Sequence, residues 1–152
     1  MYDCSAGDLL NVVADVKSYE NFIPFCSYVD IFDRSLSKEL ECFSALLSIN
    51  FKFTTENFLT KVSVNREKST ISIIGDTKPF KSLIAEWSFI EQDKYCKVTF
   101  SLEVSFTSII KEGLVSISFE KVASTILDAF ERRARERNFK IGFGSCSGRI
   151  IE

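Results

Sequence analysis

A ten-residue segment near position 100 alternates apolar and polar side chains without exception. It runs from Lys97 to Phe106, and its apolar members are Val98, Phe100, Leu102, Val104 and Phe106. Because successive side chains of a β-strand point to opposite faces, this period of two predicts a strand with one buried and one solvent-facing side. Shorter alternations at Trp87 and Phe89, and at Ile71 and Ile73, predict two more strands of the same kind.

The stretch from Glu39 to Val64 shows the same period twice, in two different phases. Odd-numbered positions are apolar first, at Phe43, Ala45, Leu47, Ile49, Phe51 and Phe53. Even-numbered positions continue the pattern, at Phe58, Thr60, Val62 and Val64. The change of phase predicts a turn or bulge between two strands, over Thr54 to Asn57. With the later alternations, this predicts a run of antiparallel strands.

Helical spacing replaces the alternation at both ends of the chain. Near the N-terminus, Ser5 can cap a helix whose apolar positions are Leu9, Val12, Val13 and Val16. One long C-terminal helix is predicted over Ser108 to Asn138, with a stripe at Val115, Phe119, Val122, Ile126 and Phe130. This order predicts an α+β fold in which an antiparallel sheet packs on one long helix. A single helix cannot fill a broad curved sheet, and we therefore expect a hydrophobic cavity between them.

The composition excludes several kinds of chemistry. The 152 residues contain no histidine, which rules out Ser-His-Asp and Cys-His nucleophile systems and any metal site that needs imidazole. The five cysteines include no Cys-x-x-Cys pair and lack the spacing of metal ligands. Nineteen basic residues against 21 acidic ones give a net charge of −2, which argues against a nucleic-acid partner. We expect no catalytic residues, no metal and no cofactor.

Four sequence blocks, in order from about Ser5 to Ala134, resemble the coenzyme Q-binding START-like family of the polyketide cyclase/START superfamily. The first block is Val12-Val13-Ala14-Asp15-Val16, Tyr19 and Phe22-Ile23-Pro24-Phe25-Cys26, with Phe25 where the family usually has Trp. The second is Leu47, Ile49, Phe51-Lys52, Glu56, Phe58 and Val62. The third is Pro79-Phe80, Leu83 and Trp87-Ser88-Phe89. The fourth is Cys96, Val98, Phe100, Phe106 and Ala129-Phe130-Glu131-Arg132-Arg133-Ala134.

The resemblance implies a helix-grip fold of the START/Bet v 1 type, in which the curved sheet wraps around the C-terminal helix. It also implies a lipid chaperone that binds ubiquinone or a polyprenyl quinone precursor and supports coenzyme Q biosynthesis and respiration. Such a protein would touch the matrix side of the inner mitochondrial membrane peripherally and serve coenzyme Q biosynthetic or respiratory complexes. The family has a strand ahead of the Ser5 helix, and we expect that strand to be truncated here, with no transit peptide visible. Residues 1–140 would form the domain, and 141–152 a flexible tail.

The predicted ligand tunnel is lined by inward-facing apolar side chains. Its candidate members are Phe51, Phe53, Phe58, Trp87, Phe89, Phe100, Val104, Phe119, Val122 and Ile126. The apolar run Phe22, Ile23, Pro24 and Phe25 is a candidate gate or membrane-facing lip, or else a loop that plugs one end of the core. A basic cluster at the end of the long helix either complements the helix dipole, which we favour, or attracts anionic lipid; it comprises Arg132, Arg133, Arg135, Arg137 and Lys140.

Two other functions are compatible with the same resemblance. Bacterial relatives of the family resemble toxins that block ribosomal subunit joining, which would make this chain a ribosome-associated interaction protein. START-like folds also host polyketide cyclases, and fold alone does not exclude an enzyme. An enzyme would need a polar constellation inside the cavity, whereas the inward-facing positions are almost wholly apolar. We therefore expect a non-enzymatic lipid-binding protein.

Overall fold

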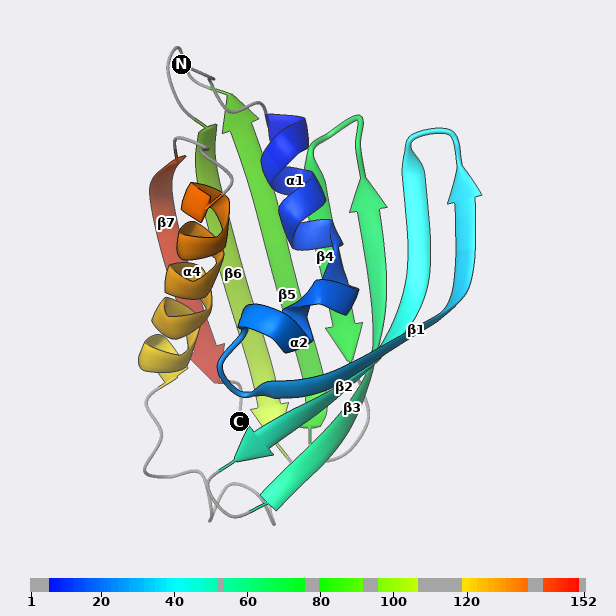
Figure 1. Cartoon of the computed structure of the whole chain (residues 1–152), viewed down its shortest axis with the longest axis vertical. Helices are drawn as coiled ribbons and strands as arrows, with labels where there is room; N and C mark the ends of the chain where they lie inside the picture. Colours follow the sequence, from blue (N-terminus) through cyan, green and yellow to red (C-terminus); the bar gives the residue numbers. More distant parts are fainter. Residues whose placement is uncertain are drawn as a thin grey trace.

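The computed structural model describes residues 6–51, 54–75, 80–91, 96–106, 119–136 and 141–150. Two short helices open this part of the chain, six strands follow, and a long helix and one more strand close it (Figure 1). The elements are α1 (Ala6–Ala14), the 3-10 turn η1 (Val16–Ser18), α2 (Tyr19–Phe22), β1 (Cys26–Ser37), β2 (Leu40–Phe51), β3 (Thr54–Asn65), β4 (Thr70–Gly75), β5 (Phe80–Glu91), β6 (Cys96–Phe106), α4 (Phe119–Glu136) and β7 (Ile141–Ile150).

The strands form one curved sheet in the order β1-β2-β3-β4-β5-β6-β7. Each of the first five strands pairs antiparallel with the next one along the chain, and β7 pairs parallel with β6. Helices α1, α2 and α4 all lie on the same side of this sheet (Figure 1). The predicted α+β class, with a curved antiparallel sheet packed against a C-terminal helix, is confirmed.

The C-terminal segment differs from the expected flexible tail, because Ile141–Ile150 forms β7. Its residues pair with β6 from Cys96↔Ile141 to Val104↔Ile150. The glycines at 142, 144 and 148 and the lack of alternation made this segment unlike a strand in the sequence. Pairing along the edge of β6, which satisfies backbone groups that would otherwise need water, overrides that weak local preference.

Three other expectations meet the structure only in part. The long helix is described over Phe119–Glu136, and the remaining predicted positions, 108–118 and 137–138, lie outside the described residues. Residues 1–4, where the truncated first strand was expected, also lie outside them. The turn predicted over Thr54 to Asn57 is wrong, because Thr54 already pairs with Phe51 and all four residues belong to β3. Because Phe51 pairs with Thr54, odd-numbered positions of β2 lie opposite even-numbered positions of β3, which accounts for the change of phase.

Strand β1 was missed in the sequence because its pattern is irregular. Register shifts interrupt its pairing with β2 between Cys26 and Tyr28 and again between Phe32 and Ser35. Beyond the first shift, side chains from η1 and α2 form hydrogen bonds with the backbone at the free edge of β1. The Val29 N–H donates to Glu20 Oε2 at 2.9 Å, and Lys17 Nζ donates to the Val29 carbonyl oxygen. A side-chain pair thus takes up backbone groups that an edge strand would otherwise offer to another chain.

The core lies between the helices and the helix-facing side of the sheet. Helix α1 contributes Leu9, Leu10, Val12 and Val13, all buried, as the helical spacing predicted. The Ala6 N–H at its start donates to Glu91 Oε1 of β5 at 2.9 Å, which ties the helix end to the sheet. The alternation on the strands is also confirmed, with these side chains buried: Phe43, Ala45, Phe58, Val62, Val64, Ile71, Ala85, Trp87, Phe89, Val98, Phe100 and Leu102.

Two leucines provide a matched test of this packing. Leu10 on α1 is 1% exposed, whereas Leu36 near the tip of the β1–β2 hairpin is 74% exposed. Leu10→Ala leaves a cavity in the core and is expected to lower the free energy of unfolding by about 2–5 kcal/mol, measured by urea denaturation. Leu36→Ala is expected to change it by no more than about 0.5 kcal/mol. Equal effects of the two substitutions would show that α1 does not pack as described.

Candidate functional site

The apolar interior beneath α4 contains a small cavity of about 10 Å³. Its walls come from four elements, α1, β5, β6 and α4. The lining side chains are Leu9, Val12, Val13, Trp87, Phe89, Val98 and Phe130. A space of this volume holds about one water molecule at most. Between these seven described side chains there is therefore room for no larger apolar guest unless they move.

Trp87 lies at the centre of an aromatic cluster that fills this interior. Its ring centroid is 4.4 Å from that of Phe100 on the neighbouring strand and 6.2 Å from that of Phe89, whose ring is parallel to it. Phe130 of α4 meets Trp87 edge to face at 4.9 Å. Edge-to-face and offset rings at these distances attract beyond their area burial. The structure thus brings three of the predicted tunnel residues, Trp87, Phe89 and Phe100, together under the helix.

The other predicted tunnel residues are placed less completely. Phe58 is buried on β3, and Ile126 is half-buried on α4 against the core. Phe51, Val104, Phe119 and Val122 lie in β2, β6 and α4, but their side chains are not among those described. Phe53 lies outside the described residues. The tunnel as a whole stays a prediction.

Sequence reasoning left out five of the residues that line the cavity. They are Leu9, Val12, Val13, Val98 and Phe130. The signals were present, because each belongs to a helical stripe or to the alternation of β6. Periodicity shows that a side chain faces inward but not which inward side chains lie near a space, which depends on how α1 and α4 converge on the sheet.

The candidate gate segment packs against α4. The ring of Phe22 in α2 meets that of Phe130 edge to face at 5.2 Å, and Tyr19 meets Phe130 at 5.1 Å. Tyr19 also donates its hydroxyl proton to the Val13 carbonyl oxygen. Of the three residues that follow, Ile23 is buried, Pro24 is exposed and Phe25 is half-buried. The segment thus lies against Phe130, a wall of the cavity, and its role as a gate or as a plug stays a prediction.

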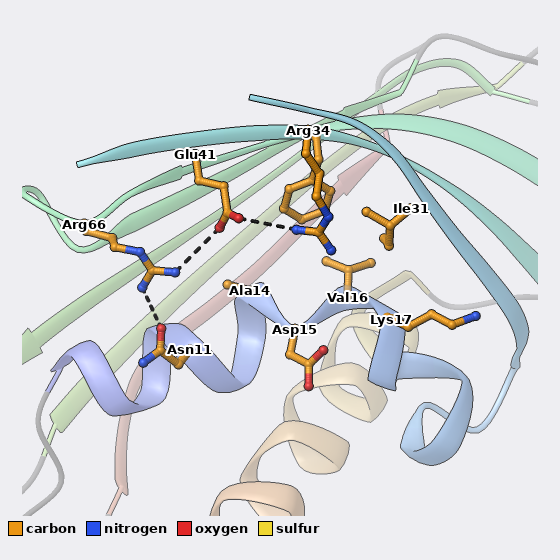
Figure 2. Close-up of a pocket in the computed structure, with 10 residues that line it drawn as sticks. Asn11, Ala14, Asp15, Val16, Lys17, Ile31, Arg34, Glu41 and Arg66 are labelled. Carbon is orange, nitrogen blue, oxygen red and sulfur yellow. Dashed lines mark hydrogen bonds and ion pairs between the residues drawn. The ribbon is translucent and has the colours of Figure 1, made fainter. Parts of the chain in front are cut away.

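A second, polar pocket of about 190 Å³ lies between α1, η1 and the β1–β2 hairpin (Figure 2). Glu41 joins two arginines there, at 3.4 Å from Arg34 Nη1 and 3.6 Å from Arg66 Nη2. Arg66 Nη1 donates to Asn11 Oδ1 of α1, and the Arg34 guanidinium lies 5.2 Å from the centroid of the Phe43 ring. No spacing in the sequence indicated this network, which links residues up to 55 positions apart.

Burial holds three described ionisable groups, Tyr19, Cys26 and Cys96, in their neutral forms. Burial, with Asp15 and Cys26 as smaller contributors, raises the pKa of Tyr19. Burial, followed by the negative charge of Glu20, raises the pKa of the Cys26 thiol to about 11. Burial and Glu91 do the same for Cys96, whose pKa also rises to about 11. These groups are therefore neither bases nor nucleophiles near neutral pH.

The described residues offer little polar chemistry inside the fold. Thr60 is the buried polar residue among them, and its hydroxyl donates to the Ala45 carbonyl oxygen at 2.9 Å. Within this part of the chain, no group of His, Cys, Asp or Glu is placed to hold a metal ion. No described helix is long and apolar enough to cross a bilayer. The described lining of the cavity is suited to an apolar guest.

The family and the relatives that this chain matches are consistent with this geometry. Residues 3–131 match the family of polyketide cyclase / dehydrase and lipid transport proteins, and the chain belongs to that family. It is 30% identical to the ribosome association toxin RatA of Pseudomonas aeruginosa, over 84% of this chain and 86% of that protein. It is 27% identical to the mitochondrial coenzyme Q-binding protein COQ10 of Drosophila melanogaster, over 88% of this chain but only 55% of that longer protein.

Solved structures support the fold assignment. The Zhui aromatase/cyclase from Streptomyces sp. R1128 superposes with a TM-score of 0.67 at 14% identity, covering 88% of each chain. The 18 kDa protein CC1736 from Caulobacter crescentus superposes with a TM-score of 0.66 at 23% identity, covering 86% of this chain and 89% of that one. The predicted helix-grip fold of the START/Bet v 1 type is confirmed, and so is the resemblance on which it rested.

The raised thiol pKa values predict selective alkylation. In a Cys4→Ser, Cys146→Ser background at pH 8, iodoacetamide should label half-buried Cys42 at least about tenfold faster than Cys26 or Cys96, because thiolate is the reactive form. Labelling of Cys26 and Cys96 should rise as the pH approaches about 11. Peptide mass spectrometry measures each rate, and urea-unfolded protein, in which the three should react alike, is the control. Fast labelling of either buried thiol at pH 8 would contradict its placement.

The Glu41 network predicts a small, salt-dependent contribution to stability. Glu41→Gln removes the carboxylate shared by Arg34 and Arg66 and should cost at most about 1 kcal/mol at low ionic strength, because these are largely surface ion pairs. The cost should shrink in high salt, which screens exposed charges. Glu39→Gln, at an exposed position on the same hairpin, is the control. If urea unfolding gives both variants the same stability in low salt, the network contributes nothing.

Proposed function

We propose that this chain binds ubiquinone or a polyprenyl quinone precursor between α4 and the sheet and shields or delivers it without changing it chemically. The observation that carries the proposal is the aromatic interior around Trp87, which has apolar walls from α1, β5, β6 and α4. A polyprenyl tail needs such walls, because unpaired polar groups there would lose their contact with water. The described ionisable groups in this interior are neutral, which agrees with a binding role.

The identity of the ligand rests on relatives. The chain resembles two proteins named for coenzyme Q binding, the COQ10 protein of Drosophila melanogaster at 27% identity and its homolog B in Xenopus laevis at 26%. This chain spans about half the length of each. Both relatives are also named as mitochondrial. We propose in addition that this chain is a peripheral protein on the matrix side of the inner mitochondrial membrane, where it would supply quinone to coenzyme Q biosynthetic or respiratory complexes.

Binding beside Trp87 requires more room than the described side chains leave there. The described cavity has a volume of about 10 Å³, whereas ligand pockets usually have several hundred. The ring of Phe130 is both a wall of the cavity and the contact of α4 with Tyr19 and Phe22. Withdrawal of α2 together with rotation of Phe130 would open a path from the surface to Trp87. The candidate gate residues Phe22, Ile23, Pro24 and Phe25 lie on that path.

Tryptophan fluorescence tests the proposal, because Trp87 is the only tryptophan of the chain and lines the cavity. Titration with a short-chain ubiquinone should quench Trp87 emission to a saturating level, since the quinone would bind within reach of the indole. The urea-unfolded chain should show only unsaturable collisional quenching. Protein purified from a quinone-producing host should also release quinone on solvent extraction. Unsaturable quenching by the folded chain, together with no extracted quinone, would refute the proposal.

The second candidate function is association with the ribosome. It is favoured by the 30% identity to the RatA toxin of Pseudomonas aeruginosa, which this chain matches over 86% of that protein's length. On this alternative, the chain would sediment with large ribosomal subunits and would be released by salt. Sedimentation of the chain with purified subunits in low and high salt distinguishes the two functions. An aromatase/cyclase activity is supported by the description of the family and by fold likeness below 25% identity, and neither identifies a catalytic residue in this chain.

A further inference from the structure

Three arginines lie close together near the end of α4, but only one of them faces the gate. Arg132 is exposed, and Arg135 is 62% exposed with both Nε and Nη2 donating to Glu131 Oε1. The side chain of Arg133 is 27% exposed, and its guanidinium lies 5.3 Å from the centroid of the Phe22 ring. Arg133 therefore bridges α4 and α2 at the point where the candidate gate closes.

The guanidinium of Arg133 has donors to spare. Among the described residues its polar contact is an ion pair, with Nη1 at 3.6 Å from Glu136 Oε2, too long for a strong hydrogen bond. A guanidinium carries five N–H donors. The contact between a half-buried cation and an aromatic ring is weak. Such a cation can therefore leave the ring and donate a hydrogen bond to an acceptor at a modest cost in free energy.

A quinone headgroup needs such a donor. The carbonyl and methoxy oxygens of ubiquinone are acceptors only, and burying them without a partner is costly. The described side chains that line the cavity are all apolar, apart from the indole N–H of Trp87. The buried hydroxyls of Thr60 and Tyr19 already donate to the carbonyl oxygens of Ala45 and Val13. The Arg133 guanidinium would supply charge-assisted donors to the headgroup at the junction of α2 and α4, which we call the mouth of the cavity.

We propose that Arg133 recognises the oxygen-bearing headgroup of the bound lipid, and that the ring of Phe22 occupies its place in the closed conformation. This inference rests on the proposed quinone-binding function and adds the residue that would select a headgroup. When α2 withdraws, the ring of Phe22 loses its contacts with the Arg133 guanidinium and with the ring of Phe130. The isoprenoid tail then extends toward Trp87, while a headgroup oxygen accepts a hydrogen bond from Arg133. Glu136 keeps the guanidinium near the mouth.

The test compares two ligands and two matched arginines. The ligands are a short-chain ubiquinone, measured by Trp87 quenching, and an isoprenoid hydrocarbon of similar length without a headgroup, measured by native mass spectrometry. Arg133→Met keeps an apolar stem against Phe22 but removes the charge and the donors, and Arg135→Met is the control. We expect Arg133→Met to weaken quinone binding by about tenfold or more, the loss of one charge-assisted hydrogen bond. Hydrocarbon binding to Arg133→Met, and binding of both ligands to Arg135→Met, should change little.

Every outcome bears on the proposal. If wild-type protein binds the quinone and Arg133→Met binds it equally well, the role of Arg133 is refuted while the proposed function stands. Equal losses for quinone and hydrocarbon would also refute it, because Arg133 would then only shape the interior. A wild-type protein that binds neither ligand refutes both proposals. Arg133→Lys, which keeps a charged donor, should have a quinone affinity between those of the wild type and Arg133→Met. If Arg133→Met does not fold, the quinone and hydrocarbon affinities of Arg133→Lys are compared with those of the wild type instead.

Discussion

The edge-to-face contact between Trp87 and Phe130 connects the two halves of the molecule. Trp87 belongs to the sheet and Phe130 to α4, and through Phe130 the contact extends to Tyr19 and Phe22 of α2. A curved sheet recedes from a straight helix, and large rings are the side chains that can span the gap between them. The sheet, α4 and α2 therefore share one aromatic cluster, and a movement of any one of them disturbs its ring contacts with the others.

This sharing creates a conflict between stability and binding. The rings that hold α4 on the sheet also line the cavity of about 10 Å³. A ligand entering there would have to replace their contacts with its own and would bind a different conformation. Its apparent affinity would be lowered by the fraction of that conformation in the free protein. An isoprenoid suits the exchange, because its branched apolar surface can pack against Phe, Val and Leu side chains in place of the displaced rings.

The sequence was most informative where one periodic pattern covered a whole element. The alternation around Phe100 predicted which side chains face inward, and Val98, Phe100 and Leu102 are buried. In the described part of the helical stripe that ends at Phe130, Ile126 is half-buried and Phe130 is buried. It was least informative where pairing is decided by tertiary contacts. Strand β1 is interrupted by two register shifts, and β7 is rich in glycine, yet both add to a sheet edge. The Glu41 network and the position of Arg133 over Phe22 also join distant segments, which no local spacing reveals.

Relatives of this chain bear names as different as ribosome association toxin and coenzyme Q-binding protein. A fold shared by both cannot carry the difference between them, so function must depend on side chains at particular places. The apolar wall around Trp87 accommodates a tail but discriminates poorly between tails, because a methylene more or less in an apolar site changes affinity only modestly. Selection is stronger where a buried acceptor is matched with a donor or left without one. In the described part of this chain, Arg133 at the junction of α2 and α4 is the group that combines partial burial, charge and free donors. The chemistry of the mouth, more than the size of the interior, would therefore decide which lipid this protein holds.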